Sequence, residues 1–290
     1  MKKLFAGCIA VSFAAMLAAC GDDDSDFATR PSEGSSSSVT PQSSDGETSV
    51  SSSNEAKSSS SSVTPQSSDS ETSVSTGTMT DSRDGQTYKT VTIGTQTWMA
   101  QNLNYAYTDV PYKSGDNTSD STSWCYNDDA NNCSKYGRLY TWAAAMDSVG
   151  TWSTNGKGCG YTKTCSPTYP VRGVCPEGWH LPDSTEWATL FTAVGGQSTA
   201  GKMLKSTSGW NDYVGESGNG TDAFAFSALS AGGRNEGGGY NGEGNGALFW
   251  SSAEGNSGSA YFMDLYFGHS YASLYSGDKD YGFSVRCLKD

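Results

Sequence analysis

The sequence predicts an α+β fold made mostly of antiparallel sheet, with two short helices, long Gly-rich loops and several disulfides. Three observations lead to this prediction. Short runs of β-branched and aromatic residues, separated by Gly, Asn and Asp, recur beyond residue 80. Two segments in the same region have apolar residues at helical spacing. Six of the eight cysteines also lie there. Many strands with few helices are typical of the α+β class.

Composition divides the 290 residues into three regions. Residues 1–19 start with the basic Lys2 and Lys3, continue with an apolar stretch and end in Leu-Ala-Ala before Cys20, as in a lipoprotein signal peptide. A transmembrane helix is the alternative, but charged residues at both ends leave too few apolar residues to cross a bilayer. We therefore expect cleavage before Cys20 and acylation of this cysteine, for example with palmitate, which would anchor the protein to a membrane.

An acidic run and a Ser-rich segment follow Cys20. The run, Gly-Asp-Asp-Asp-Ser-Asp at 21–26, resembles the export signal of surface lipoproteins in some Gram-negative bacteria. Retention in the periplasm is the alternative. The Ser-rich segment has almost no large apolar side chains, so it cannot bury enough surface to offset the entropy of ordering. We expect residues 20–80 to be a disordered tether that displays an outer-membrane lipoprotein at the cell surface.

Residues 81–290 are the predicted globular domain and contain all 8 Trp and all 16 Tyr. They include 21 acidic and 14 basic residues, a net charge of −7, which argues against nucleic acid as a partner. Residues 196–203, Gly-Gln-Ser-Thr-Ala-Gly-Lys-Met, nearly match a phosphate-binding loop. They lack the Ser or Thr that must follow Lys to hold magnesium, so we expect a helix end and turn there, and no nucleotide.

The cysteines of the domain predict disulfides, because their number is even and the protein is exported. They are Cys125, Cys133, Cys159, Cys165, Cys175 and Cys287. Proximity along the chain favours Cys125 with Cys133 and Cys159 with Cys165, which leaves Cys175 to pair with Cys287. A zinc site is the alternative, but the sequence has no Cys-x-x-Cys pair and only two His.

The predicted elements begin with a hairpin and two helices. Alternating apolar residues at 88–93 and 98–99, separated by Gly94-Thr95, predict the two strands of the hairpin. Helical spacing predicts a first helix within 137–146 and a central helix over 184–194. A capping box of Asp183 and Glu186 marks the start of the central helix, and its Trp187 faces the core.

Gly-rich sequence runs from residue 209 to 246. Within it, the apolar residues at 224–229 predict one strand. Further strands are predicted at 247–251, at 260–267, more weakly at 271–275, and at 281–288. These strands complete the sheet part of the fold.

Six motifs in this region resemble those of the Fibrobacter succinogenes major paralogous domain, and the resemblance covers all of 81–290. The motifs are Tyr-Lys-Thr-Val at 88–91, Trp-Met-Ala-Gln-Asn-Leu at 98–103, Gly-Arg-Leu-Tyr-Thr-Trp at 137–142, Gly-Val-Cys-Pro-Glu-Gly-Trp-His-Leu-Pro at 173–182, Phe-Trp-Ser-Ser at 249–252 and Gly-Phe-Ser-Val-Arg-Cys at 282–287. The His-Leu-Pro element and the closing Gly-Phe-x-x-Arg are more remotely similar to the C-type-lectin-like superfold, which includes formylglycine-generating enzymes. The resemblance implies a C-type-lectin-like fold and an extracellular location, and it carries no chemistry with it.

A calcium site is one interpretation of the loop after residue 209. Trp-Asn-Asp at 210–212 matches the triplet whose Asn and Asp bind calcium in C-type lectins, but it has no Glu-Pro-Asn partner in the chain. A loop cap is the alternative. The oxygen-bearing side chains close enough in sequence to bind calcium are Asp212, Glu216, Asn219 and Asp222. We expect no other cofactor.

Tyrosines of the Gly-rich loops are the candidate ligand-binding residues, because Tyr gives rigid contact area and stacks on sugar faces. They are Tyr213, Tyr240, Tyr271 and Tyr275. Ordinary packing is the alternative for each. We expect His180 to be a buried, hydrogen-bonded structural residue. No Gly-x-Ser-x-Gly motif lies between a strand and a helix, and Cys287 is the only late cysteine, so no catalytic residue is predicted.

Together these features predict a surface-tethered lipoprotein with a non-catalytic binding or adhesion domain. Its partners would be the membrane, through the lipid anchor, and a polysaccharide or an extracellular protein. Two alternatives remain open: an extracellular enzyme that acts on polymer or on partner proteins, and a structural envelope protein without a specific ligand.

Overall fold

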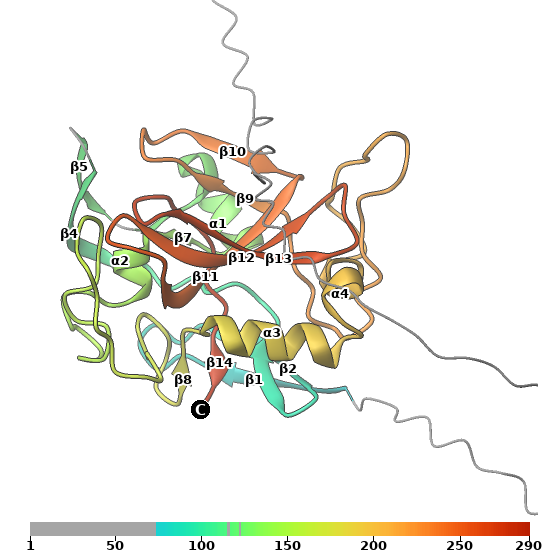
Figure 1. Ribbon diagram of the computed structural model, residues 1–290, viewed down its shortest axis with the longest axis horizontal. Coiled ribbons are helices and arrows are strands. Elements are labelled where there is room, and N and C mark those ends of the chain that lie inside the picture. The colour runs from blue at the N-terminus through green and yellow to red at the C-terminus, as the bar shows by residue number, and fades with distance from the viewer. Residues whose placement is uncertain (1–73, 115–116, 122) are drawn as a thin grey trace, which may run out of the picture. The chain divides into compact units, whose positions relative to one another are not determined.

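The computed structural model describes residues 74–114, 117–121 and 123–290. The predicted signal peptide, the predicted acylation site Cys20 and most of the predicted tether lie outside these residues. The described part is an α+β fold in which nearly all strand pairs are antiparallel (Figure 1). Within it, no helix has both the length and the apolar character needed to span a membrane.

The first sheet joins the beginning and the end of the domain. Its strands, in spatial order, are β1 (Ser75–Thr80), β2 (Thr87–Ile93), β3 (Gln96–Met99), β14 (Leu288–Lys289) and β8 (Trp179–His180). All neighbours are antiparallel, and β2 and β3 form the predicted hairpin. Strand β1 lies in the segment that the sequence assigned to the tether. Its residues are polar and mostly exposed, and it pairs through its backbone at the edge of the sheet, so its composition gives no strand signal.

The second sheet is built from the five consecutive strands that precede β14. Its order is β10 (Tyr240–Glu243), β9 (Ala231–Arg234), β11 (Gly246–Glu254), β12 (Ser259–Tyr266) and β13 (Ala272–Asp278). Only the β9–β11 pair is parallel. Strands β11, β12 and β13 confirm three predicted strands, and β13 is an edge of the sheet. Two small two-stranded sheets pair β4 (Thr108–Ser114) with β5 (Asn117–Ser121), and β6 (Ser123–Trp124) with β7 (Leu139–Tyr140).

The described residues form four α-helices where the sequence predicted two. They are α1 (Ala130–Tyr136), α2 (Trp142–Ala145), α3 (Ser184–Ala193) and α4 (Gln197–Leu204), and a short 3-10 turn, η1, covers Tyr126–Asp128. Helix α3 is the predicted central helix with its capping box in place. The predicted first helix is shorter than expected, because residues 139–140 pair as β7 and Thr141 caps a helix that begins only at Trp142.

Two helices were missed by the sequence prediction, and local contacts explain both. Asp129 accepts a hydrogen bond from the backbone N–H of Asn131 and so starts α1 inside a segment that reads as turn. The predicted turn at 196–203 is a helix of its own. Gly195 and Gly196 both have positive φ, so the chain ends α3 and turns at once into α4.

Helix α3 lies between the two large sheets (Figure 1). Its Trp187 is fully buried; the ring stacks on Trp98 of β3 at 4.6 Å and lies 6.0 Å from Phe249 of β11. The structure contains all three favoured disulfides, Cys125–Cys133, Cys159–Cys165 and Cys175–Cys287. The last one joins the turn before α3 to the end of the chain, so the helix and the first sheet are cross-linked.

The predicted strand at 224–229 is wrong. Ala225 and Ser227 have positive φ, which no strand permits. The guanidinium of the buried Arg286 donates to the carbonyl oxygens of Phe226 and Ser227, so these groups point at a side chain and not at a neighbouring strand. The predicted strand at 281–288 shrinks to β14 for a similar reason. Its earlier residues bond in turn to Arg234, Tyr140 and Leu248, which lie in three different strands.

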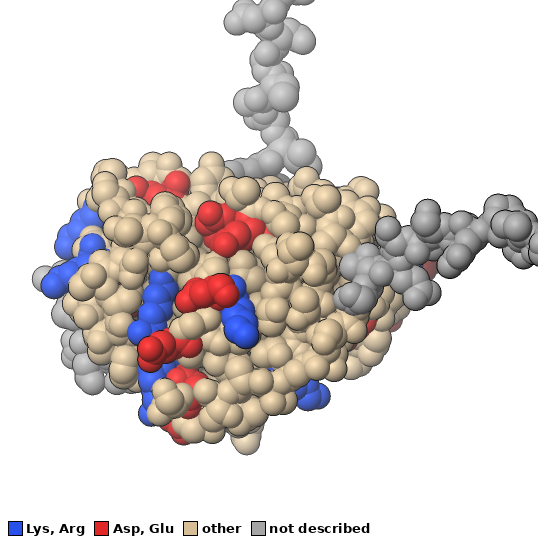
Figure 2. Space-filling model, turned by 90° about the horizontal axis from the view of Figure 1, so that it is seen from below, with Lys and Arg blue, Asp and Glu red and all other residues tan. Residues whose placement is uncertain are grey.

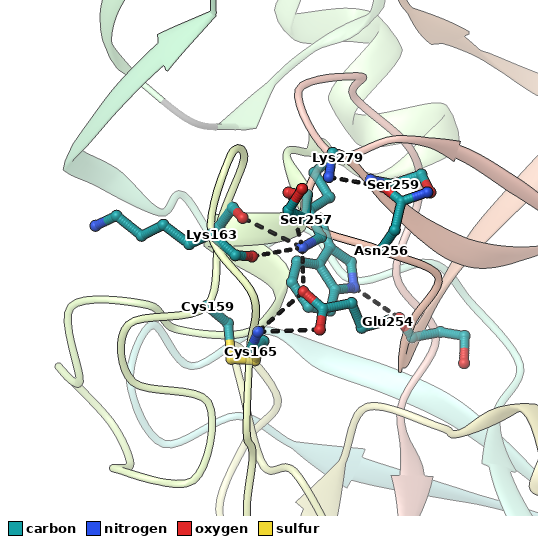
Figure 3. A network of polar contacts seen from close by, with 12 residues as sticks. Cys159, Lys163, Cys165, Glu254, Asn256, Ser257, Ser259 and Lys279 are labelled. Atoms are coloured by element: carbon teal, nitrogen blue, oxygen red, sulfur yellow. Dashed lines mark hydrogen bonds and ion pairs between the residues drawn. A yellow bond between two sulfur atoms is a disulfide. The ribbon is translucent and has the colours of Figure 1, made fainter.

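A buried lysine fixes the loop that Cys159–Cys165 closes (Figure 3). The ammonium group of Lys279 forms an ion pair with Glu254 and donates to the carbonyl oxygens of Gly160, Lys163 and Ser257. Glu254 also accepts the backbone N–H of Cys165. Because every one of these groups has a partner within the protein, we interpret the cluster as a structural contact that holds this loop against β11.

Charges of both signs are mixed on one face of the domain. Figure 2 shows this face from below; Lys and Arg lie beside Asp and Glu, and uncharged residues cover most of it. This face therefore carries no large field of a single sign.

Candidate functional site

Exposed large apolar side chains gather around the β12–β13 hairpin. Six of the nine in the described residues are found there: Tyr213 (45% exposed), Val214 (87%), Tyr266 (37%), Tyr271 (39%) and Tyr275 (50%), with Tyr261 (38%) on the other face of β12. A soluble domain normally buries most such groups or scatters them singly, so a cluster of this kind marks an interaction surface.

The register of the strands places three of these tyrosines on one face. On β12, Phe262, Asp264 and Tyr266 alternate with the buried Met263 and Leu265. Tyr275 of β13 is opposite Phe262, and Ser273 is opposite Asp264. Residues directly opposite in an antiparallel pair share a face, so Tyr266 and Tyr275 lie on the same side of the sheet as Asp264, and Tyr271, which directly precedes β13, continues the same alternation. We call these four residues, together with His269, the hairpin surface.

Asp264 stands at the centre of the hairpin surface without a partner. Its neighbours across the sheet are Leu248 on β11 and Ser273 on β13. No hydrogen bond or ion pair joins its carboxyl group to any other described residue. Burial raises the pKa of Asp264 to about 7, because the charged form has lost water and gained nothing in return. A carboxyl group in such a position is a functional-site candidate.

His269 completes the surface at the turn of the hairpin. Its ring stacks on Tyr271 at 4.4 Å and lies 5.1 Å from Tyr266. Burial, helped by the nearby charge of Lys205, lowers the pKa of His269. The imidazole is therefore neutral at pH 7, and the turn presents an uncharged aromatic group.

Helix α4 holds this turn in place. The ammonium group of Lys205 donates to the carbonyl oxygens of Tyr266, Phe267 and His269 at 3.0 to 3.3 Å. Gly201 packs so closely on the hairpin that an added Cβ would collide with the carbonyl oxygen of Tyr271. The contacts from Lys205 and Gly201 thus fix the backbone of the turn, while the side chains of Tyr266 and Tyr271 stay exposed.

A pocket of about 410 Å³ adjoins the turn. Its lining includes Tyr213, Glu216, Phe267 and His269, and Tyr213 meets Phe267 edge to face at 5.2 Å. His269 belongs to both the pocket and the hairpin surface, so the two form one continuous region. The volume lies in the range of pockets that hold small ligands or one end of a larger one.

The family of the chain follows from a comparison of its sequence with family models. Residues 91–289 match the family described as Fibrobacter succinogenes major domain (Fib_succ_major). The chain belongs to this family. Searches among curated proteins and among solved structures found no match.

In this Fibrobacter succinogenes major domain, three of the four candidate tyrosines come together. Tyr271 and Tyr275 lie on the hairpin surface, and Tyr213 lies in the adjoining pocket. Tyr240 does not join them. It lies on β10, where its hydroxyl donates to Asp128 at 2.6 Å and its ring packs 5.3 Å from Tyr126. These contacts are those of a packing residue, and ligand binding by Tyr240 stays a prediction.

The four candidate calcium ligands are partly engaged within the protein. The side-chain oxygen of Asn219 accepts the backbone N–H of Trp210, and Asp222 accepts both the N–H and the hydroxyl of Ser227. Among the described residues, no three His, Cys, Asp or Glu side chains are grouped closely enough to hold a metal ion. All four residues stay predictions as calcium ligands.

His180 is the buried, hydrogen-bonded residue that the sequence predicted. Its Nδ1 lies 2.7 Å from Asp290 and its Nε2 lies 2.9 Å from Glu186. Glu186 also accepts the backbone N–H of Asp183 to close the capping box. This histidine therefore connects the start of α3 to the C-terminal residue.

Sequence reasoning missed Asp264, Tyr266 and Lys205, and it left the role of the loop residue His269 open. One signal was available for Asp264. The alternation Phe-Met-Asp-Leu-Tyr at 262–266 puts a carboxylate on a strand face that is otherwise aromatic. No pattern along the chain identifies Lys205, because its partners are backbone carbonyl groups about sixty residues away.

Proposed function

We propose that this protein is a surface-tethered lipoprotein whose C-terminal domain binds polysaccharide without altering it. The observation that carries the proposal is the cluster of exposed tyrosines at the β12–β13 hairpin, on a turn held by Lys205. Rigid aromatic side chains provide contact area at low entropic cost, and their faces suit the apolar faces of sugar rings. A fixed turn keeps this surface ready for a ligand.

The tether and the anchor complete the proposal. The features of residues 1–80 predict acylation at Cys20, a Ser-rich spacer and export to the cell surface. A spacer of this length holds a binding domain clear of the membrane. In this proposal the lipid anchor lies in the outer membrane and the domain lies on the extracellular side, where it contacts polysaccharide.

We also propose a C-type-lectin-like arrangement for the domain. It is supported by the pairing of the last strand of the domain with strands from its beginning and middle. Strand β14 pairs with β3 and β8, and Cys175–Cys287 cross-links the same region. The long irregular segments between the helices and β11 then lie between these fixed ends, as binding loops do in that superfold.

Retention of purified full-length protein on immobilised plant and microbial polysaccharides tests the proposed function. We expect retention by at least one polymer, and a loss of roughly tenfold or more in affinity for the double variant Tyr271→Ala/Tyr275→Ala. Tyr261→Ala is the matched control, because Tyr261 is also exposed on β12 but pairs with Ser276, on the opposite face of the sheet.

Two further measurements separate the alternatives. Release of new sugar ends from a retained polymer would show an enzyme and contradict the proposal. Repeating the assay with EDTA tests calcium; a loss of retention would assign a role to Asp212 and Glu216. Equal retention of the double variant and the control would remove the hairpin surface from the function.

A further inference from the structure

We infer that Asp264 is the hydrogen-bonding group of the hairpin surface, and that the ligand is an extended, uncharged polysaccharide whose hydroxyl groups donate to its carboxylate. This inference rests on the proposed function and names the chemistry of its ligand. Three observations support it.

The first observation is that the fold does not use the carboxyl group of Asp264. Two other carboxylates of the domain are used by the fold: Asp147 accepts three backbone N–H groups and the hydroxyl of Tyr107, and Asp183 caps α3. Asp264 has only Leu248 and Ser273 opposite it, and it bonds to neither. A half-buried carboxylate without partners costs stability, and a bound ligand that donates hydrogen bonds would remove that cost.

The second observation concerns charge. The titratable groups that face Asp264 are the phenols of Tyr266 and Tyr271, whose pKa values burial raises further. The neutral His269 lies beyond them, and the ammonium group of Lys205 is occupied by three carbonyl oxygens. The ionised surface is therefore negative, and it repels carboxylated or sulfated polymers. Sugar hydroxyl groups donate hydrogen bonds to a carboxylate and carry no charge.

The third observation is the spread of the aromatic rings. Tyr275 lies on the edge strand β13 and Tyr271 directly precedes the first residue of this strand, so the two backbone positions are about 13 Å apart in extended chain. A compact cation is held by rings that close around one point. Rings in a row, on an open edge, fit a ligand that extends along the strand. Asp264, one strand inward, faces the rim of such a chain, where its hydroxyl groups lie.

Affinity electrophoresis of the full-length protein tests the inference with three soluble probes: a neutral mixed-linkage glucan, the anionic polygalacturonate and a cationic polymer of amino sugars (the polyamine). We expect retardation by the glucan alone. Asp264→Leu should weaken it by tenfold or more, and Asp264→Asn by several fold, because an amide keeps one weaker acceptor. Asp278→Asn is the matched control, since it removes an exposed carboxylate at the end of the same hairpin.

The pH profile adds a readout that a purely structural role would not move. Hydroxyl donors favour the ionised carboxylate, so retardation should strengthen from pH 6 to pH 8 as Asp264 loses its proton. Burial lowers the pKa of Lys205 to about 8, so this lysine titrates in the same range. Asp264→Asn keeps the contribution of Lys205 and lacks that of the carboxyl group, so the difference between the wild-type and variant profiles isolates Asp264, and the variant should lose the rise between pH 6 and pH 8 that the carboxyl group causes.

The outcomes are distinct for the two proposals. Wild-type retardation by glucan with unchanged Asp264 variants would overturn this inference and leave the proposed function standing. Preference for the polyamine would show a cation site, and preference for polygalacturonate would show an anion site; either result overturns the inference. Retardation by none of the probes, with no retention on any immobilised polysaccharide, would overturn both.

Discussion

Aromatic and charged side chains are buried and paired in the region around α3, whereas on the hairpin surface they are exposed or without a partner. Around α3, Trp187 is fully buried, His180 and Glu186 are paired, and a disulfide closes the region. On the hairpin surface, tyrosines are about half exposed and Asp264 has no partner among the described residues. The contacts of the first region stabilise the fold, whereas the unpaired carboxyl group of Asp264 in the second lowers the stability of the folded state. Stability and binding should therefore respond to different substitutions.

The largest loss of stability is expected when the long disulfide is removed. Cys175 and Cys287 are 112 residues apart, so the chain-entropy model gives a loss of roughly 4 to 5 kcal/mol for the double Ser variant. Cys125 and Cys133 are only 8 apart, and their removal should cost roughly 2 to 3 kcal/mol. Urea unfolding of both variants measures the difference. Equal losses would show that the long loop closed by Cys175–Cys287 contributes no more to the free energy of unfolding than the short loop closed by Cys125–Cys133.

A smaller, pH-dependent loss is expected at His180. Burial opposes its charge, but the hydrogen bonds to Glu186 and Asp290 prevail and raise its pKa above 6.5. The charged form therefore stabilises the fold fully below the unfolded pKa, and this contribution disappears as the pH rises through the folded pKa. His180→Gln should lose more stability at pH 5.5 than at pH 8.5, measured by urea unfolding. A loss that is independent of pH would contradict this.

At Asp264 a gain in stability is expected. Its folded pKa of about 7 is above its ordinary value of 3.8, so ionisation costs folding energy that begins above pH 4 and levels off above pH 7. Asp264→Asn should unfold at a higher temperature than the wild type at pH 8 and at the same temperature at pH 4. A lower unfolding temperature at pH 8 would reveal a partner that supports the charge.

The smallest change in stability is expected for the exposed tyrosines. Tyr275→Ala should alter the free energy of unfolding by no more than about 0.5 kcal/mol, because half of its side chain is already in water. Trp187→Ala, by comparison, should cost about 3 to 5 kcal/mol. Parallel urea titrations give both values. A large loss for Tyr275→Ala would place it in the core and not on a binding surface.

The same contrast explains how far the sequence could predict the structure. Helix α3 was predicted to within one residue, because its capping box and apolar face are local signals. The disulfides followed from short spacing and from the single pair that remained. The irregular path at 224–229 depends on Arg286, about sixty residues away, so its apolar residues suggested a strand. The alternation at 262–266 marks Asp264 along the chain, but its neighbours Leu248 and Ser273 are known only when three strands are placed in register.

Binding by the Tyr271→Ala/Tyr275→Ala variant, measured beside its urea unfolding curve, decides whether the hairpin surface binds the ligand. We expect affinity for a retained neutral polysaccharide to fall roughly tenfold or more while stability stays within about 1 kcal/mol of the wild type. Tyr261→Ala should match the wild type in both. Undiminished affinity in the double variant, with the fold intact, would contradict the claim that this hairpin binds the ligand.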